Sequence, residues 1–185
     1  MMADRVDLDQ QRLGTVERTH GGAHTTLRFE RQLDATPEEV WRALTEPAEL
    51  SVWFGCPVDV IPGVRIQIRF ADSPPQDGRI VTWDPPSRLA FEWDDHYPRK
   101  ADRDRSMSLV TFELERSGAG TRLVLVHSNG EPKEWKDNLG GWHGHLVALR
   151  EHLAGRSVEF KPLFAATSRL YETVSTDTWP AGLEA

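Results

Sequence analysis

The chain has 185 residues, of which 38% are hydrophobic and 28% charged, and these values describe one globular domain with tails. Its formal net charge of −7 argues against a nucleic acid or an anionic membrane surface as partner, because no basic stripe could offset phosphate repulsion. The single cysteine, Cys56, excludes an intrachain disulfide and a cysteine-based metal cluster.

The chain carries no membrane-spanning or targeting signal that we recognise. No apolar run reaches the length that crosses a bilayer, and the first residues lack the charged-then-apolar order of a signal peptide. We therefore expect a cytoplasmic protein with no membrane partner. Residues 1–12 are polar and predict a loose tail, residues 13–155 predict the folded domain, and residues 156–185 predict a C-terminal tail.

The first predicted element is a β-hairpin. Residues 13–19 and 25–33 flank a glycine-centred turn, which is typical of hairpin connections. Alternate residues from Leu27 to Leu33 share one apolar face, which Arg31 interrupts. This face is expected to point toward the core.

Two short helices are predicted next. Thr36 at the N-cap, Pro37 at the first helical position and Glu39 three residues after the cap form a capping box. A second helix begins at Pro47 and ends at Gly55. The side chains expected to face the core from these helices are Val40, Trp41, Leu44, Leu50, Trp53 and Phe54.

The pattern then changes to a period of two, which predicts strands. Apolar and polar residues alternate over residues 64–70, a second strand covers 78–83, and a third covers 89–93. Residues 107–115 and 121–128 form a further hairpin across a turn with two glycines. Strands that alternate and connect in this way predict an antiparallel sheet.

A long helix is predicted over residues 134–153. Its large apolar residues repeat at intervals of four and three, which keeps them within one stripe: Trp135, Leu139, Trp142, Leu146, Leu149 and Leu153. Gly140, Gly141 and Gly144 lie away from this stripe and would each cost about 1 kcal/mol relative to alanine. They indicate either a late helix start or a surface that another segment approaches closely, and we expect the late start as the simpler account.

A short amphipathic helix is predicted in the tail, around residues 163–174. It packs either on its own domain or on a second copy of the chain, which would produce a homodimer. Strands followed by segregated helices predict an α+β fold. We expect a curved antiparallel sheet wrapped around the long C-terminal helix.

Several segments in this order resemble a known superfamily. They are residues 37–47 with Trp53 and Phe54, residues 78–93, Gly120 to Leu123 with His127, and Gly141 and Trp142 with Leu146 and Leu149. The sequence resembles the START-like or SRPBCC superfamily over about residues 13–155, and within it the branch of homologues of the activator of the heat-shock-protein ATPase. The resemblance implies the helix-grip fold of Bet v allergens and START-like proteins, with a cavity between long helix and sheet. It does not choose a function, since related proteins carry lipids, cyclise polyketides or bind chaperones.

The leading hypothesis is non-catalytic binding of a small apolar or amphipathic molecule in that cavity. The residues expected to line it are Trp53, Phe54, Phe70, Trp83, Phe91, Trp93, His127, Asn138, Trp142, His145, Leu146 and Leu149. The polar members would fix the orientation of the ligand. Alternatively, the histidines are half-exposed and bonded to the backbone, and the bulky rings fill the interior.

Two other functions stay open from the sequence. The resemblance implies a co-chaperone-like module that binds a chaperone, and a cyclase- or hydrolase-like enzyme would use His127 and His145 in the same cavity. Asp94 and the following residues could supply an acid–base pair, but we expect a solvated charged loop instead, because the sequence places no nucleophile or oxyanion donor nearby. We expect no cofactor and no metal, because His143 and His145 are two residues apart and point about 200° apart on a helix.

Overall fold

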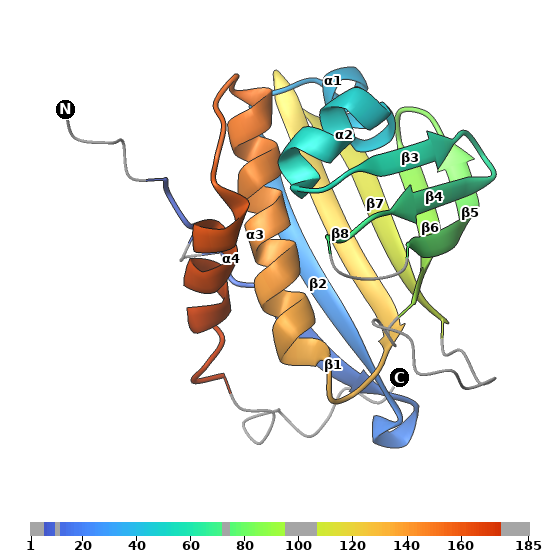
Figure 1. Ribbon diagram of the computed structural model, residues 1–185, viewed down its shortest axis with the longest axis vertical. Helices are drawn as coiled ribbons and strands as arrows, with labels where there is room; N and C mark the ends of the chain where they lie inside the picture. The colour runs from blue at the N-terminus through green and yellow to red at the C-terminus, as the bar shows by residue number, and fades with distance from the viewer. Residues whose placement is uncertain (1–5, 10–11, 72–74, 95–106, 175–185) are drawn as a thin grey trace.

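The computed structural model describes the chain except for residues 1–5, 10–11, 72–74, 95–106 and 175–185. One curved antiparallel sheet holds a long helix against its concave face (Figure 1). The predicted α+β helix-grip fold is therefore confirmed. No helix within the described ranges is both long enough and apolar enough to cross a bilayer.

Within the described residues, eight strands form the sheet in the order β1-β2-β8-β7-β6-β5-β4-β3, and each neighbouring pair is antiparallel. The strands are β1 (Thr15–Thr19), β2 (His24–Leu33), β3 (Val58–Ile61), β4 (Arg65–Ile68), β5 (Gln76–Asp84), β6 (Arg88–Asp94), β7 (Met107–Ser117) and β8 (Gly120–Gly130). A short 3₁₀ turn, His20–Gly22, connects β1 to β2. The predicted inward row on β2 is confirmed, and Arg31 is buried within it.

Two features of the sheet differ from the sequence prediction. The sequence does not predict β3, whose four residues are too few to establish an alternating pattern. The strand predicted over residues 64–70 is reduced to the four residues of β4. Val64 lies in the β3–β4 turn beside Gly63, which has a positive φ of 68°, so the Val64 side chain is exposed.

The two short helices follow the capping prediction. α1 spans Pro37–Thr45, and its capping box is complete, with the Glu39 N–H donating to Thr36 Oγ1 and the Thr36 N–H donating to Glu39 Oε2. α2 spans Pro47–Phe54 and ends at Gly55, which adopts the left-handed conformation. Both helices cover one end of the sheet (Figure 1).

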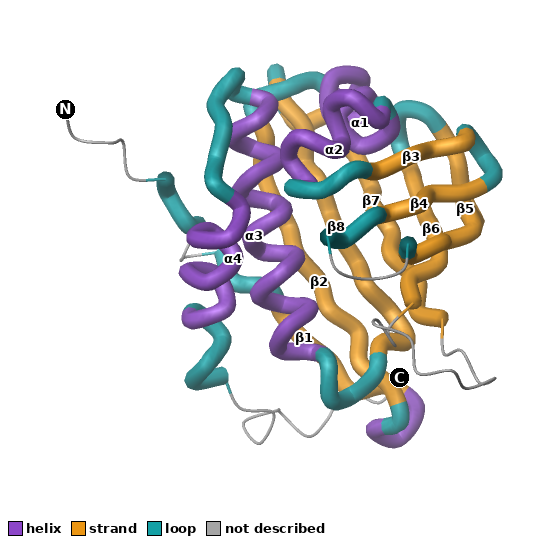
Figure 2. Tube along the Cα trace, viewed as in Figure 1, coloured by secondary structure: helices purple, strands orange, loops and turns teal. Residues whose placement is uncertain are grey.

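The long helix α3 spans Trp135–Leu153, so it begins where the sequence predicts and not late. Its glycines lie inside the helix because a second helix, α4 (Phe160–Arg169), packs along α3 on the side away from β8 (Figure 2). A Cβ added at Gly140 would lie 2.6 Å from Ser168 Oγ. The expected late start is wrong, and close approach by the C-terminal segment is the physical reason for the glycines.

Candidate functional site

The interior between α3 and the sheet is an aromatic cluster centred on Trp142, which we call the indole cluster. The Trp142 ring lies 5.1 Å from Trp93, 6.1 Å from Phe112 and 6.2 Å from Phe54, measured between centroids. These separations are those of favourable edge-to-face and tilted ring pairs. Rings from α2, α3, β6 and β7 therefore meet at one point beneath the long helix.

His127 of β8 is buried beside this cluster, and its hydrogen bonds define its tautomer. The Trp142 Nε1–H donates to His127 Nδ1 at 3.0 Å, so Nδ1 carries no proton. Nε2 then carries the ring proton and donates to Ser108 Oγ at 2.6 Å, and Ser108 Oγ donates in turn to the Trp93 carbonyl at 3.2 Å. In this arrangement His127 cannot accept a proton from Ser108, so the pair is not set up as a nucleophile and its base.

The ring of His145 of α3 also lies beside Trp142, with centroids 5.7 Å apart. Its ring stacks between Phe54, with centroids 3.9 Å apart, and Phe160, at 4.5 Å. Burial lowers the pKa of His145 to about 3, so the ring is neutral at physiological pH. His145 Nδ1 is buried and has no hydrogen-bond partner among the described residues.

Most of the predicted lining residues meet in or around the indole cluster. Trp53 and Phe70 both pack on Phe54, and Phe91 stacks on Phe112. Leu146 and Leu149 are buried in the core beneath α3. His127 and His145 are only 1% and 8% exposed, so the alternative of half-exposed rings bonded to the backbone is wrong.

Two predicted residues lie apart from these ring contacts. Trp83 contacts Trp41 of α1, at a centroid distance of 5.2 Å. Asn138 is half-buried and lies one helical turn before Trp142 on α3. Of the acidic segment that begins at Asp94, the residues after Asp94 lie outside the described part of the chain.

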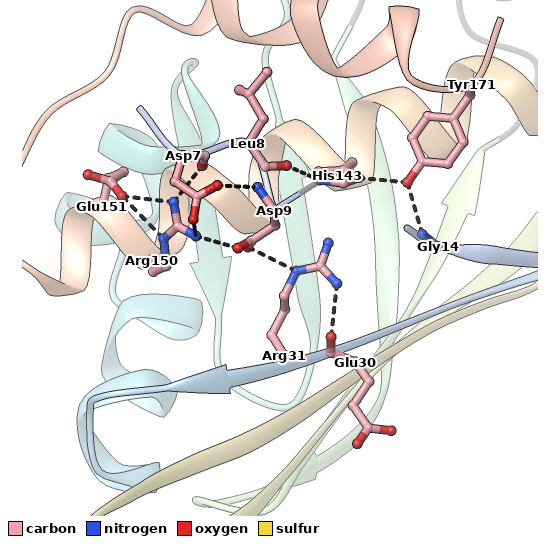
Figure 3. Close-up of polar contacts among 10 residues, drawn as sticks. All are labelled: Asp7, Leu8, Asp9, Gly14, Glu30, Arg31, His143, Arg150, Glu151 and Tyr171. Carbon is pink, nitrogen blue, oxygen red and sulfur yellow. Dashed lines mark hydrogen bonds and ion pairs between the residues drawn. The ribbon is translucent and has the colours of Figure 1, made fainter. Parts of the chain in front are cut away.

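A second polar site lies on the opposite flank of α3, where His143 connects three segments (Figure 3). A carbonyl only accepts, so the 2.6 Å contact with the Leu8 carbonyl places the proton on His143 Nε2. Nδ1 accepts from the Tyr171 hydroxyl at 2.6 Å, and that oxygen accepts from the Gly14 N–H at 2.9 Å. Burial, and next the charge of Arg31, lower the pKa of His143 to about 4.

Beside His143, charged side chains surround Asp9 (Figure 3). Asp9 Oδ1 lies 2.6 Å from Arg150 Nη1, and Asp9 Oδ2 lies 3.4 Å from Arg31 Nε. Arg150 also contacts Glu151, whose other oxygen pairs with Arg156. The sequence shows Arg31 only as an exception in an apolar row, and a buried arginine on an inward face is the signal that could have identified this site.

Two grooves of the described surface lie on this flank. One has a volume of about 670 Å³ and runs between residues 6–8 and the segment from Val158 to Ala166. The other has a volume of about 430 Å³ and is lined in part by Arg31. The predicted lining residues contribute to neither groove.

No three histidine, cysteine or carboxylate side chains of the described ranges are close enough to share a metal ion. His143 and His145 face different surroundings, as the helical geometry predicts. Burial raises the pKa of the Cys56 thiol to about 11, so this cysteine is not an activated nucleophile.

Comparison with known proteins identifies relatives of the fold. The model of the family described as "Activator of Hsp90 ATPase homolog 1-like protein" matches residues 34–154. Comparison with curated proteins gives no match.

Solved structures share the architecture. Protein MLL2253 from Mesorhizobium loti is 27% identical, with a TM-score of 0.62 over 72% of this chain and 99% of that chain. The Aha1 dimer from Colwellia psychrerythraea is 20% identical, with a TM-score of 0.59 over 69% of this chain and 95% of that chain. A protein from the dynemicin biosynthetic locus, DynU16, is 22% identical, with a TM-score of 0.60 over 71% of this chain and 48% of that chain. The latter two likenesses concern the fold alone.

Proposed function

The chain belongs to the family of Activator of Hsp90 ATPase homolog 1-like proteins, and we propose that it binds a small, uncharged amphipathic molecule at the indole cluster. The family contributes the START-like architecture, in which the space beneath the long helix is the place for a ligand. The proposal concerns binding without catalysis, since His127 donates to Ser108 and cannot activate it.

The observation that carries this proposal is the unpaired Nδ1 of His145. A buried polar atom without a partner costs about 1–3 kcal/mol, so proteins seldom keep one without a use. A ligand hydroxyl or amide at this nitrogen would supply the missing hydrogen bond. The neighbouring rings of Phe54, Phe160 and Trp142 would contact the apolar part of the same molecule.

Because His145 is neutral at physiological pH, we expect the ligand to be uncharged as well. Because burial disfavours the imidazolium, the ring offers no positive charge to an anion. A carboxylate would lose its hydration there without a counter-charge, which is costly. Neutral ligands such as fatty alcohols and hydroxylated polycyclic aromatics therefore suit this site better than fatty acids.

Titration of the tryptophan fluorescence with dodecanol and with a hydroxylated anthraquinone tests the proposal. Binding should quench or shift the emission of Trp142 and raise the melting temperature, and His145→Phe should remove both effects. His152→Phe is the matched control, because His152 lies on the same helix and pairs with Glu49 outside the cluster. An unchanged spectrum and melting temperature for every neutral ligand would contradict the proposal.

A second candidate is a co-chaperone-like protein interaction. It is favoured by an exposed apolar corner at the β3–β5 end of the sheet, formed by Ile61, Val64 and Val81. The Val64 N–H donates to the Ile61 carbonyl and the Ile80 N–H donates to the Val64 carbonyl, so the backbone segments that carry these side chains are adjacent. Measuring the ATPase rate of a purified Hsp90 with the wild-type chain and with Val64→Lys tests this alternative: a rate that neither protein changes would exclude it.

A further inference from the structure

Arg31 is the most unusual residue of the described sheet. It occupies an inward position of β2 between Phe29 and Leu33, and its side chain is only 3% exposed. A buried guanidinium needs a counter-charge and acceptors for its five N–H bonds, or its desolvation is not repaid. Arg31 satisfies this requirement only in part.

Nη1 of Arg31 donates to the backbone carbonyl of Glu30 at 2.8 Å. Nε lies 3.4 Å from Asp9 Oδ2 but does not form a hydrogen bond with it, and Nη2 is buried without a hydrogen-bond partner among the described residues. The edge of the guanidinium that carries Nε and Nη2 is the edge that a carboxylate normally binds through two parallel bonds. In this protein that edge is largely unused.

Arg31, whose unused edge is buried, contributes to the lining of a groove of about 430 Å³. Three arginines line the groove, namely Arg12, Arg31 and Arg150, together with Asp7, Asp9, Gln32 and Leu33. Glu151 is the other nearby carboxylate, and it is engaged by Arg150 and Arg156. Asp7 is exposed and lies 3.8 Å from Arg150, so within the described residues Asp9 is the carboxylate that forms an ion pair with Arg31.

Asp9 is already a carboxylate in this position. It reaches Arg150 with one oxygen at 2.6 Å and approaches Arg31 with the other (Figure 3). It belongs to a short strap, residues 7–9, which lies over the groove and is attached to α3 through the Leu8 carbonyl and His143. The strap therefore holds the Asp9 carboxylate beside Arg31 without a hydrogen bond to Nε. A ligand carboxylate in the same place could form hydrogen bonds to both Nε and Nη2.

We infer that Arg31, with Arg150 and Arg12, forms a binding site for an organic carboxylate, and that Asp9 occupies this site in the free protein. The ligand carboxylate displaces Asp9 and bonds to Nε and Nη2 of Arg31. This site is separate from the indole cluster, lies on the opposite flank of α3, and takes an anion in place of a neutral molecule. Its occupation does not depend on the function proposed above.

Asp9 acts as an internal competitor, which makes the inference testable by a conservative change. Asp9→Asn keeps the size of the side chain and suits the positive φ of 50° at this position, but it removes the competing charge. Because a tethered group competes at an effective concentration in the millimolar range, its removal should tighten carboxylate binding about tenfold. Asp7→Asn is the matched control, since it removes the same charge from the same strap without touching Arg31.

The experiment follows the ¹⁵N–¹H signal of Arg31 Nε in the full-length protein during titration with sodium hexanoate at constant ionic strength. The signal is assigned from its absence in Arg31→Lys or Arg31→Gln. Hexanoate should shift it in the wild type and shift it about tenfold more readily in Asp9→Asn. Asp7→Asn should tighten binding much less than Asp9→Asn, because Asp7 approaches Arg150 at 3.8 Å but forms no ion pair with Arg31. A parallel titration with inorganic phosphate distinguishes carboxylate recognition from binding of any oxyanion.

Three results would overturn the inference. The first is an Arg31 signal in Asp9→Asn that hexanoate does not move. The second is equal tightening in Asp7→Asn and Asp9→Asn, which would mean that net charge alone is responsible. The third is a response to phosphate without a response to hexanoate, which would assign the groove to a different class of anion. If Arg31→Gln fails to fold, the comparison of the two aspartate variants still decides the outcome.

Discussion

Two histidines, two residues apart on α3, show how differently the flanks of this helix are built. Both are buried, and burial lowers both pKa values, that of His143 to about 4 and that of His145 to about 3. His143 uses both ring nitrogens to connect the N-terminal strap to Tyr171. His145 lies among aromatic rings with an unpaired Nδ1. Both histidines are buried, but His143 holds two segments together through its ring nitrogens, whereas His145, within the described residues, keeps one ring nitrogen free for a hydrogen bond.

The largest effect is expected from removing the ring that lies at the centre of the indole cluster. Trp142→Ala should lower the free energy of unfolding by about 3–5 kcal/mol, because it opens a cavity and removes the donor to His127 Nδ1. Trp142→Phe keeps most of the packing and should cost about 1–3 kcal/mol, mainly for the lost hydrogen bond. Urea unfolding followed by circular dichroism measures both values, and equal losses would mean that packing of the ring is unimportant.

The second effect concerns pH and the flank of His143. In the unfolded chain this ring titrates near its ordinary pKa of 6.5, whereas the folded pKa is about 4. The unfolded state therefore binds more protons between pH 6.5 and 4, and stability falls as the pH falls through this window. The stability associated with the neutral His143 ring is fully present above pH 6.5, and the loss amounts to about 3 kcal/mol by pH 4.

His143→Gln isolates this contribution. Its unfolding free energy should fall less steeply between pH 6.5 and 4 than that of the wild type, and His145, which titrates lower, should account for part of the remaining slope. Chemical denaturation at several pH values gives the two curves. Parallel curves would show that His143 becomes protonated without disturbing its contacts with Leu8 and Tyr171.

The sequence predicts the elements of both flanks better than their contacts. The apolar period of α3, the capping box at Thr36 and the alternation of β2 depend on local geometry, and the structure has them. The glycines of α3 are different, because their cause is α4, which arrives from later in the chain. The same holds for His143, whose partners Leu8 and Tyr171 lie at opposite ends of the sequence.

The indole cluster was partly predictable for the same reason. Residues on the inward faces of α3, β6 and β8 can be assigned from periodicity, and Trp93, His127 and Trp142 do meet. Trp83 packs on Trp41 of α1, which alternation could not predict, because it gives the face of a strand but not the position along the sheet at which α1 covers it. Whether an inward polar group finds a partner depends on three-dimensional contacts that no sequence pattern specifies.

A smaller effect should follow from adding a methyl group between α3 and α4. Gly140→Ala should destabilise the protein by about 1–2 kcal/mol, because its Cβ would lie 2.8 Å from the Ser168 backbone and the crowding exceeds the gain in helix propensity. Gly141→Ala is the control, since its Cβ would meet only the end of the Phe164 ring, at 3.2 Å. Thermal unfolding compares them; a stabilised Gly140→Ala protein would mean that α4 can move away from α3 at little cost.

The smallest change in stability is expected at His145, and it separates the flanks most directly. His145→Phe removes an unpaired polar atom and keeps a ring between Phe54 and Phe160, so the unfolding free energy should change by less than about 1 kcal/mol. The same substitution at His143 leaves the Leu8 carbonyl without its donor and should cost about 2–3 kcal/mol. If His145→Phe is as costly as His143→Phe, then His145 has a structural role and the proposed ligand contact loses its basis. If His145→Phe is instead neutral or stabilising, then the wild-type protein keeps a histidine that does not contribute to its stability. A residue kept at a cost in stability is expected where its side chain binds a ligand.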